Sequence, residues 1–300
     1  MKILVPIDGS SYSENSIAFL ASRTSLFGEN PTIELLVIFN SVPGNTSDCA
    51  RKRYCEEQAE AIFAPARKLL VGKRIQLVES FLLGDPAEKI AEEATRFSAD
   101  LIVMGSRGRT ALAGLFLGSV TNGVLKSTKI PVLILRDQPA PHSEAIRIGI
   151  AVDGSKYGQA AVRYVLENPS FFGKTSEVFL LHVTNDYAST VYPDIFGMSL
   201  PTLSAEEISA MQKKEFSEVM APLLPLFEKA GIKPRLIGLS GNPGDEIAAY
   251  AKKEGLDLIV MGSHGYGRLK SAVMGSTALR IASRGNVPLL VTQVTEEEST

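Results

Sequence analysis

The sequence has few cysteines, no excess of charge of one sign and no long apolar run. Its two cysteines, Cys49 and Cys55, cannot build a disulfide framework and fit a reducing compartment. Its 31 lysines and arginines nearly balance 33 aspartates and glutamates, for a net charge of −2. That balance argues against a nucleic-acid binder, which would show a clustered basic excess. A hydrophobic share of 45% excludes a largely disordered chain.

Membrane and secretion signals are also missing from the sequence. No apolar run approaches the roughly 18 residues that cross a membrane as a helix. Near the amino end, one lysine precedes a short apolar run from Ile3 to Ile7, which Asp8 ends. A secretory signal peptide needs a longer apolar region and a cleavage site of small residues. We therefore expect, by default, a cytoplasmic protein without a membrane partner.

The chain contains an internal repeat. VPIDGSSYSENSIAFL at residues 5–20 resembles IAVDGSKYGQAAVRYVL at 150–166, and DLIVMGS occurs unchanged at 100–106 and 257–263. The first pair of segments is offset by 145 positions and the second by 157. The second half therefore has 12 extra residues between the two motifs, which we place in the irregular stretch 187–202.

The repeat divides the chain into two domains, expected at residues 1–138 and 145–295. A length of 300 residues fits two units of about 150 residues each, and each unit is long enough to bury its own core. The stretch 137–144 (DQPAPHSE) has two prolines and no apolar period, which is typical of a linker.

Short apolar runs rich in β-branched residues alternate with helical patterns in each half. In the first half we expect strands at residues 2–7, 33–39, 75–83, 101–104 and 132–135. Asp85 and Pro86 indicate the start of a helix, and Ser204 with Glu207 forms a capping box before a long helix in the second half. The alternation predicts an α/β fold of two tandem doubly wound domains, each a parallel sheet flanked by helices.

Two glycine-containing turns follow expected strands in each half. Asp8-Gly9-Ser10 and Asp153-Gly154-Ser155 follow the first strand, and longer glycine loops follow the fourth. In doubly wound sheets, ligands bind at the carboxyl ends of the strands where the strand order reverses. If the first and fourth strands are neighbours, both turns line one crevice. The alternative for the aspartates is that they only fix the turn or cap the next helix, rather than act as catalytic groups.

The longer loops share one spacing, Gly-x2-Gly-x9-Gly-Ser. The first copy runs from Gly105 to Ser119 and the second from Gly262 to Ser276, where helical patterns begin. Glycines let backbone N–H groups approach an anion, and a helix start adds unpaired N–H groups and positive dipole. The spacing therefore predicts a phosphate site in each half. The alternative is that these glycines only shape tight turns between strands and helices.

With these motifs, and with Pro131 and Pro288 before the last strand of each half, the chain resembles the universal stress proteins over nearly its whole length. The resemblance implies a five-stranded parallel sheet of order 3-2-1-4-5 in each domain. It also implies binding of an adenine nucleotide, ATP, with or without Mg²⁺. It further implies association of the two halves through strands 132–135 and 289–292, with a homodimer as an open alternative.

The resemblance assigns the nucleotide contacts residue by residue. Adenine and ribose would lie against Asp8 and Ile38 in one half and Asp153 and Val183 in the other. The ribose would also be lined by Met104 and Gly105, and by Met261 and Gly262. The phosphates would be held in the first half by Gly108, Gly118, Ser119 and Val120, and in the second by Gly265, Gly275, Ser276 and Thr277.

The sequence leaves three functions to weigh. The first is an ATP-binding protein of stress response or regulation, which is not an enzyme. The second is a slow ATP hydrolase on the same scaffold, for which no dedicated base or acidic metal cluster is evident. The third is an interaction module without a ligand. The three histidines, His142, His182 and His264, show no metal-ligand spacing, so no metal site is expected.

Overall fold

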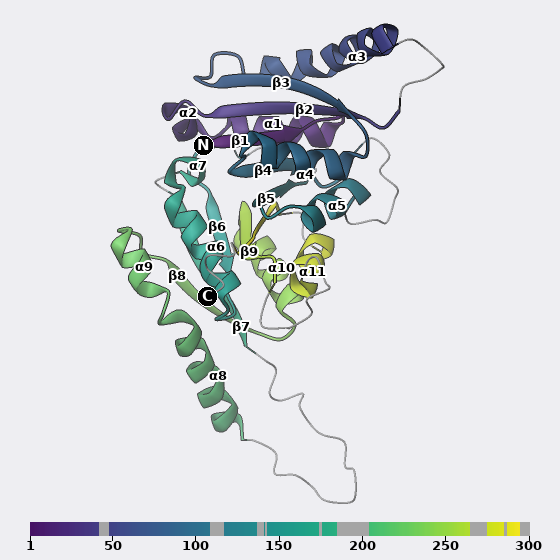
Figure 1. The fold of residues 1–300 in the computed structure, drawn as a ribbon. Helices are drawn as coiled ribbons and strands as arrows, with labels where there is room; N and C mark the ends of the chain where they lie inside the picture. Colours follow the sequence, from purple (N-terminus) through teal and green to yellow (C-terminus); the bar gives the residue numbers. More distant parts are fainter. Residues whose placement is uncertain are drawn as a thin grey trace, which may run out of the picture.

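The structure is a computed structural model that describes residues 1–41, 48–108, 117–136, 141, 143–173, 176–184, 204–264, 275–284 and 287–294. Its strands join in one sheet of order β3-β2-β1-β4-β5-β10-β9-β6-β7-β8 (Figure 1). The strands of the first half are β1 (Lys2–Pro6), β2 (Thr32–Phe39), β3 (Gln76–Leu83), β4 (Leu101–Gly105) and β5 (Val132–Leu135). Those of the second half are β6 (Arg147–Ala151), β7 (Glu177–Thr184), β8 (Arg235–Ser240), β9 (Leu258–Gly262) and β10 (Leu289–Thr292).

Strand order and direction confirm the expected architecture. Each half has the order 3-2-1-4-5, and the pairs within each half are parallel. The two halves meet at β5 and β10, which pair antiparallel with Leu133 opposite Leu290. The predicted association through the last strands is therefore confirmed, and it merges two domains into a single sheet.

Helices cover both faces of this sheet, and each face has a core that draws on both halves. On one face, Phe19 and Phe171 from different halves meet with ring centroids 6.3 Å apart. The helices of that face are α1 (Ser11–Ala21), α2 (Thr24–Gly28), α3 (Asp48–Leu69), α6 (Lys156–Glu167), α7 (Pro169–Phe172), α8 (Ala205–Met220) and α9 (Leu224–Lys229). Those of the other face are α4 (Pro86–Phe97), α5 (Ser119–Ser127), α10 (Pro243–Glu254) and α11 (Ser276–Arg284).

Local signals for helix starts are confirmed. The Asp85 side chain accepts a hydrogen bond from the Glu88 N–H at the start of α4, and Ser204 with Glu207 forms the capping box of α8. Strand boundaries differ from the expected ones by one residue at most. The predicted insertion at 187–202 lies outside the described residues. No helix among the described residues has the length and apolar character needed to cross a membrane.

The end of the expected linker is bound to the first half. Arg23, fully buried, donates hydrogen bonds to the carbonyl oxygens of Ser143 (2.6 Å) and Glu144 (2.9 Å). The Glu144 carboxylate accepts hydrogen bonds from the Ser25 N–H (2.6 Å) and from the Thr24 hydroxyl. The donors from Ser25 and Thr24 hold the pKa of Glu144 below its usual value. Residues 143–144 are thus a fixed contact between the halves.

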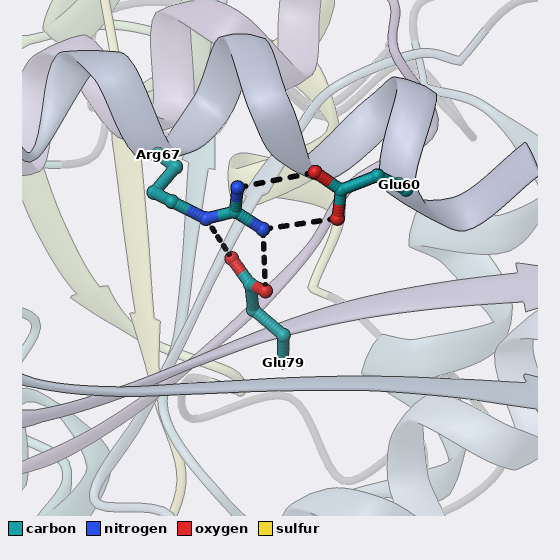
Figure 2. Close-up of polar contacts among 3 residues, drawn as sticks. All are labelled: Glu60, Arg67 and Glu79. Carbon is teal, nitrogen blue, oxygen red and sulfur yellow. Dashed lines mark hydrogen bonds and ion pairs between the residues drawn. The ribbon is translucent and has the colours of Figure 1, made fainter. Parts of the chain in front are cut away.

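An ion-pair cluster ties the long helix α3 to the edge strand β3 (Figure 2). Arg67 donates two hydrogen bonds to the Glu79 carboxylate (2.8 and 2.9 Å) and two to Glu60 (3.1 Å each). These donors hold the pKa of Glu60 below its ordinary value. The planar guanidinium allows this double bidentate geometry, which a lysine cannot reproduce. The cluster fixes the helix that borders the candidate site described below.

The equivalent helix contacts of the two halves, α4 with α5 and α10 with α11, have the glycine on opposite helices. A Cβ atom built on Gly123 of α5 would lie 2.4 Å from the Ala87 Cβ of α4. At the corresponding contact in the second half, α10 supplies the glycine: a Cβ on Gly244 would lie 2.5 Å from the Arg280 Cβ of α11. Each contact therefore has room for one side chain only, so the helix-interior glycine at position 123 is a packing requirement.

We expect Gly123→Ala to lower the free energy of unfolding by about 1–2 kcal/mol, because overpacking outweighs the better helix propensity of alanine. Adding Ala87→Gly should restore most of the loss, because it reproduces the arrangement of the second half. Urea denaturation followed by circular dichroism measures both variants. Gly28→Ala is the matched control, since a Cβ there meets nothing within 4 Å. A double variant no more stable than Gly123→Ala would contradict the packing explanation.

Candidate functional site

The aspartates after β1 and β6 shape the turns in which they lie. The Asp8 Oδ1 atom accepts hydrogen bonds from the Ser10 N–H (3.0 Å) and hydroxyl (2.6 Å). Asp153 makes the same pair of contacts with Ser155, at 3.0 and 2.5 Å. The glycine between them has a positive φ in both turns, +76° at Gly9 and +83° in the second half. One carboxylate oxygen thus has the turn-fixing role that was the alternative for these residues.

The second oxygen of Asp8 faces the glycine loop. A Cβ atom on Gly108 would lie 2.7 Å from Asp8 Oδ2, so a side chain at this position would displace the carboxylate. The contact follows from the sheet, in which β1 and β4 are parallel neighbours. The backbone N–H of Gly118 donates to the Ser106 carbonyl (2.8 Å), which closes the loop. The structure thus places Gly108 beside Asp8, and Gly118 at the closure of the same loop.

The second half repeats the loop closure in its described part. The Gly275 N–H donates to the Ser263 carbonyl (2.9 Å), matching the contact of the first half. Gly265, predicted as a phosphate contact, lies outside the described residues. Gly105 and Gly262, predicted to line the ribose, also have a packing role. A Cβ there would lie 2.6 Å from Cβ of Tyr12 and 2.5 Å from that of Tyr157, on the helices that follow β1 and β6.

The helices after the glycine loops begin without a side-chain cap or an acidic residue. Gly118 is the N-cap of α5, with a φ of −65°, and Ser119 is its first residue. Ser276 likewise begins α11, whose first turn has no acidic residue. The unpaired N–H groups of such a turn form a partial positive charge that suits an anion. The φ at Gly118 is negative and a Cβ there would make only ordinary contacts, so neither backbone conformation nor packing within the chain requires glycine at this position.

A cavity of about 310 Å³ opens next to Asp8, between α1 and α3. This volume is at the lower end of the range for small-molecule sites. Its lining is about equally apolar and polar. Ile7, which follows β1, Phe39 at the end of β2 and Ile62 of α3 are apolar, whereas Glu14 and Gln58 are polar. Sequence reasoning missed Phe39 and Ile62. Their apolar character gave no signal, since it is shared with core residues throughout the chain.

The other predicted contacts lie in the apolar core. Met104 and Met261 are buried to 5% and 8% exposure, within the cluster that packs against α4, α5, α10 and α11. Three more predicted residues are partly buried and pack against the same cluster: Ile38, Val120 and Val183. Thr277 lies in the first turn of α11, beside Ser276.

The histidines of the described region have protein partners. His182 is buried, with Nδ1 2.9 Å from the Val152 carbonyl oxygen and Nε2 3.4 Å from the Glu215 carboxylate. His264 Nδ1 lies 3.0 Å from the Ser263 hydroxyl. His142 is outside the described residues. Among the residues that are described, no group of three or more His, Cys, Asp or Glu side chains is arranged to hold a metal ion.

The chain is similar to known proteins along its whole length. The profile of the universal stress protein family matches residues 1–136 and again 146–293. A universal stress protein of Mycolicibacterium smegmatis is 24% identical over 299 residues, covering 96% of each chain. One from Methanocaldococcus jannaschii is 33% identical over 147 residues, covering 46% of this chain and 89% of its own. The crystal structure of a universal stress protein from Archaeoglobus fulgidus superposes on this chain with a TM-score of 0.67, at 22% sequence identity. The match covers 99% of this chain and 97% of the other, so the two proteins share the fold.

Proposed function

Since this chain belongs to the universal stress protein family, with two family domains in tandem, we propose that it binds ATP and acts in stress response or regulation. The boundaries proposed for the two domains are 1–138 and 145–295. A cytoplasmic location and a homodimer stay predictions from the sequence and the family resemblance. The proposal for the ligand depends on the geometry around Asp8.

The position of Asp8 between two different environments carries the proposal. On one side it borders the part of the cavity that Phe39 and Ile62 line, and on the other its Oδ2 atom faces Gly108 of the glycine loop. The parts of a nucleotide follow the same order: an apolar base, a ribose with hydroxyl donors, and phosphates. In this arrangement the base would lie toward the cavity, a ribose hydroxyl would donate to Asp8, and the phosphates would lie over the loop and the start of α5.

The ligand class is one that other family members hold. One solved universal stress protein is in complex with cAMP, and one from Arabidopsis thaliana has AMP bound. The match of this chain to either covers about half of its length, so the argument depends on the site of this chain itself. The ends of β1 and β6 carry the same Asp-Gly-Ser turn, and the loops close in the same way, which supports one site in each half.

We propose binding without an enzymatic role. Family relatives are stress proteins, and hydrolysis would require an activated water held by a base or a metal. In this chain the Asp8 and Asp153 carboxylates already accept two hydrogen bonds from the serine two residues later. No acidic metal cluster occurs within the described part of the chain. Multiple-turnover release of phosphate by the purified protein would support slow ATP hydrolysis instead.

Removing one hydroxyl at the start of α5 or α11 should weaken ATP binding at that site. Ser119→Ala and Ser276→Ala each delete a donor to a phosphate oxygen while keeping the backbone N–H and the helix dipole. We expect a loss of roughly 10- to 150-fold in ATP affinity at the altered site, the usual effect of one hydrogen bond to a charged group. Isothermal titration of ATP and of adenosine on each variant measures it.

Adenosine is the internal control, because it has no phosphates and should bind both variants as it binds the unaltered chain. Equal losses for adenosine and ATP would show that the serines act through the fold rather than through phosphate. Unchanged ATP affinity in both variants would refute the phosphate assignment. An empty protein that binds neither compound would favour an interaction module without a ligand.

A further inference from the structure

Three buried polar atoms at the carboxyl ends of β4 and β5 have no hydrogen-bond partner in the described chain. They are Ser106 Oγ, Arg107 Nε and Arg136 Nη2. The two strand ends are joined by a hydrogen bond from the Ser106 N–H to the Leu135 carbonyl (2.7 Å), so Arg107 and Arg136 leave neighbouring strands side by side. Buried polar groups are nearly always hydrogen-bonded, so three buried polar atoms without a partner at one place point to a ligand.

Electrostatics makes the arrangement costly without an anion. Burial, and then the positive charge of Arg107, lower the pKa of Arg136 below its usual value. Two guanidinium groups that repel each other and leave N–H donors unpaired destabilise the folded chain. The planar donor array of arginine matches a phosphate group, which accepts several charged hydrogen bonds at once. The start of α5 lies next to them, since a Cβ on Gly118 would be 3.5 Å from the Arg107 Cα.

The second half has the same backbone arrangement at its strand ends, but there the serine hydroxyl has a hydrogen-bond partner within the chain. The Ser263 N–H donates to the Thr292 carbonyl (2.8 Å), as Ser106 does to Leu135. Here the serine hydroxyl pairs with His264 at 3.0 Å, and the histidine ring lies 5.4 Å from the ring of Tyr157. The position of Arg136 is taken by Gln293. Within the described residues of the two loops, the orphaned donors and the second positive charge therefore occur in the first half.

We propose that Arg107 and Arg136 bind a phosphate group, forming an anion subsite that the second half lacks. The inference builds on the proposed nucleotide function and makes the two sites unequal. The first half should prefer nucleotides with more phosphate charge, whereas the second should discriminate among them less. The phosphate is either the terminal group of the bound nucleotide or a free phosphate ion, because both present the same oxygens to the arginines.

The test uses the full chain with Arg136→Gln, which installs the residue that the second half has at this position. The backbone amide resonances of Gly118 and Gly275 report the two sites separately in titrations with ATP, adenosine and pyrophosphate. We expect the variant to lose roughly 10- to 50-fold in ATP affinity at Gly118, with adenosine there and ATP at Gly275 unchanged. Arg53→Gln is the matched control, since this exposed arginine of α3 carries the same charge and should change each affinity less than twofold.

Pyrophosphate separates this inference from the proposed function. If neither ATP nor adenosine binds the unaltered chain, the nucleotide proposal fails. Pyrophosphate that shifts Gly118 in the unaltered chain and not in Arg136→Gln still supports the anion subsite. Equal binding of ATP and of pyrophosphate to both proteins at Gly118 overturns the inference and leaves the nucleotide proposal intact.

Thermal unfolding gives an independent readout. In phosphate-free buffer, Arg136→Gln should melt at a higher temperature than the unaltered chain, because one of two like charges is gone. Added phosphate should raise the melting temperature of the unaltered chain more than that of the variant. A variant that melts lower in phosphate-free buffer and gains as much from added phosphate would contradict the subsite.

Discussion

Replacing Leu290 with alanine is expected to lower the free energy of unfolding by about 4 kcal/mol and to weaken both halves together. Leu290 is fully buried on β10, directly opposite the equally buried Leu133 of β5. Deleting a fully buried leucine side chain removes its hydrophobic transfer energy and leaves a cavity, which together cost about 2–5 kcal/mol. The upper part of that range applies because the pair lies where two halves share one core.

Urea denaturation gives the size of the effect, and amide hydrogen exchange shows where it acts. Exchange should accelerate in β4 of the first half and in β9 of the second, since both strands flank the junction. Leu236→Ala is the matched control, because Leu236 lies on the edge strand β8 and is 38% exposed. Faster exchange in the second half alone would mean that the halves unfold independently, and it would contradict a shared core.

The junction also shows which parts of the fold the sequence could predict. Alternating strand and helix signals, the Asp85 cap and the repeated DLIVMGS gave element types, boundaries and the duplication, because each depends on residues close in the sequence. The order of strands and the pairing of residues 132–135 with 289–292 came from the family resemblance. No local pattern specifies a contact between strands more than 150 residues apart.

The candidate site was predictable where backbone geometry governs it. The paired turns and glycine loops had to converge once β1 and β4 were neighbours, and Asp8 does meet Gly108. The sequence did not show why each individual position requires glycine. Positive φ occurs at Gly9 and Gly154 in the aspartate turns, whereas Gly105 and Gly262 are needed for the approach of a helix. Which contact excludes a Cβ atom depends on tertiary packing, which one sequence does not show.

The buried acidic pair on β2 and α4 is a feature that the sequence did not reveal. Glu34 is fully buried and Glu93 is 3% exposed, although each lies among apolar residues that predict an ordinary core strand or helix. In the second half the corresponding positions are Phe179 and Tyr250, whose rings are 6.4 Å apart. A local pattern cannot indicate that two carboxyl groups from different elements will share one interior.

Burial keeps Glu34 mostly protonated below pH 7. It raises the pKa of Glu34 from 4.5 to about 7, and the neighbouring Glu93 adds to the rise against the opposing effects of Ser80 and Arg96. The Ser80 hydroxyl donates to Glu34 at 2.5 Å. Hydrogen bonding from Arg96 lowers the pKa of Glu93, which stays ionised. The pair thus holds one proton and one negative charge.

Stability should therefore fall as the pH rises toward and through 7. The folded chain binds the Glu34 proton more tightly than the unfolded chain, so this contribution is complete below about pH 4.5 and is lost as the pH passes about 7. The two pKa values correspond to a loss of about 3 kcal/mol across that window. Urea denaturation at intervals from pH 5 to pH 8 measures this slope.

Glu34→Gln should remove most of the slope and make the chain about 3 kcal/mol more stable than the unaltered protein at pH 8, because the amide is neutral at every pH. The difference between the two proteins isolates the contribution of Glu34 from that of every other ionisable group. Glu92→Gln is the matched control: this exposed carboxylate of α4 pairs with Lys89, and its removal should leave the slope unchanged. The double variant Glu34→Phe/Glu93→Tyr, which copies the second half, should also lack the slope. An identical slope in the unaltered chain and in Glu34→Gln would show that Glu34 is ionised throughout and that the acidic pair is held by Arg96 rather than by a proton.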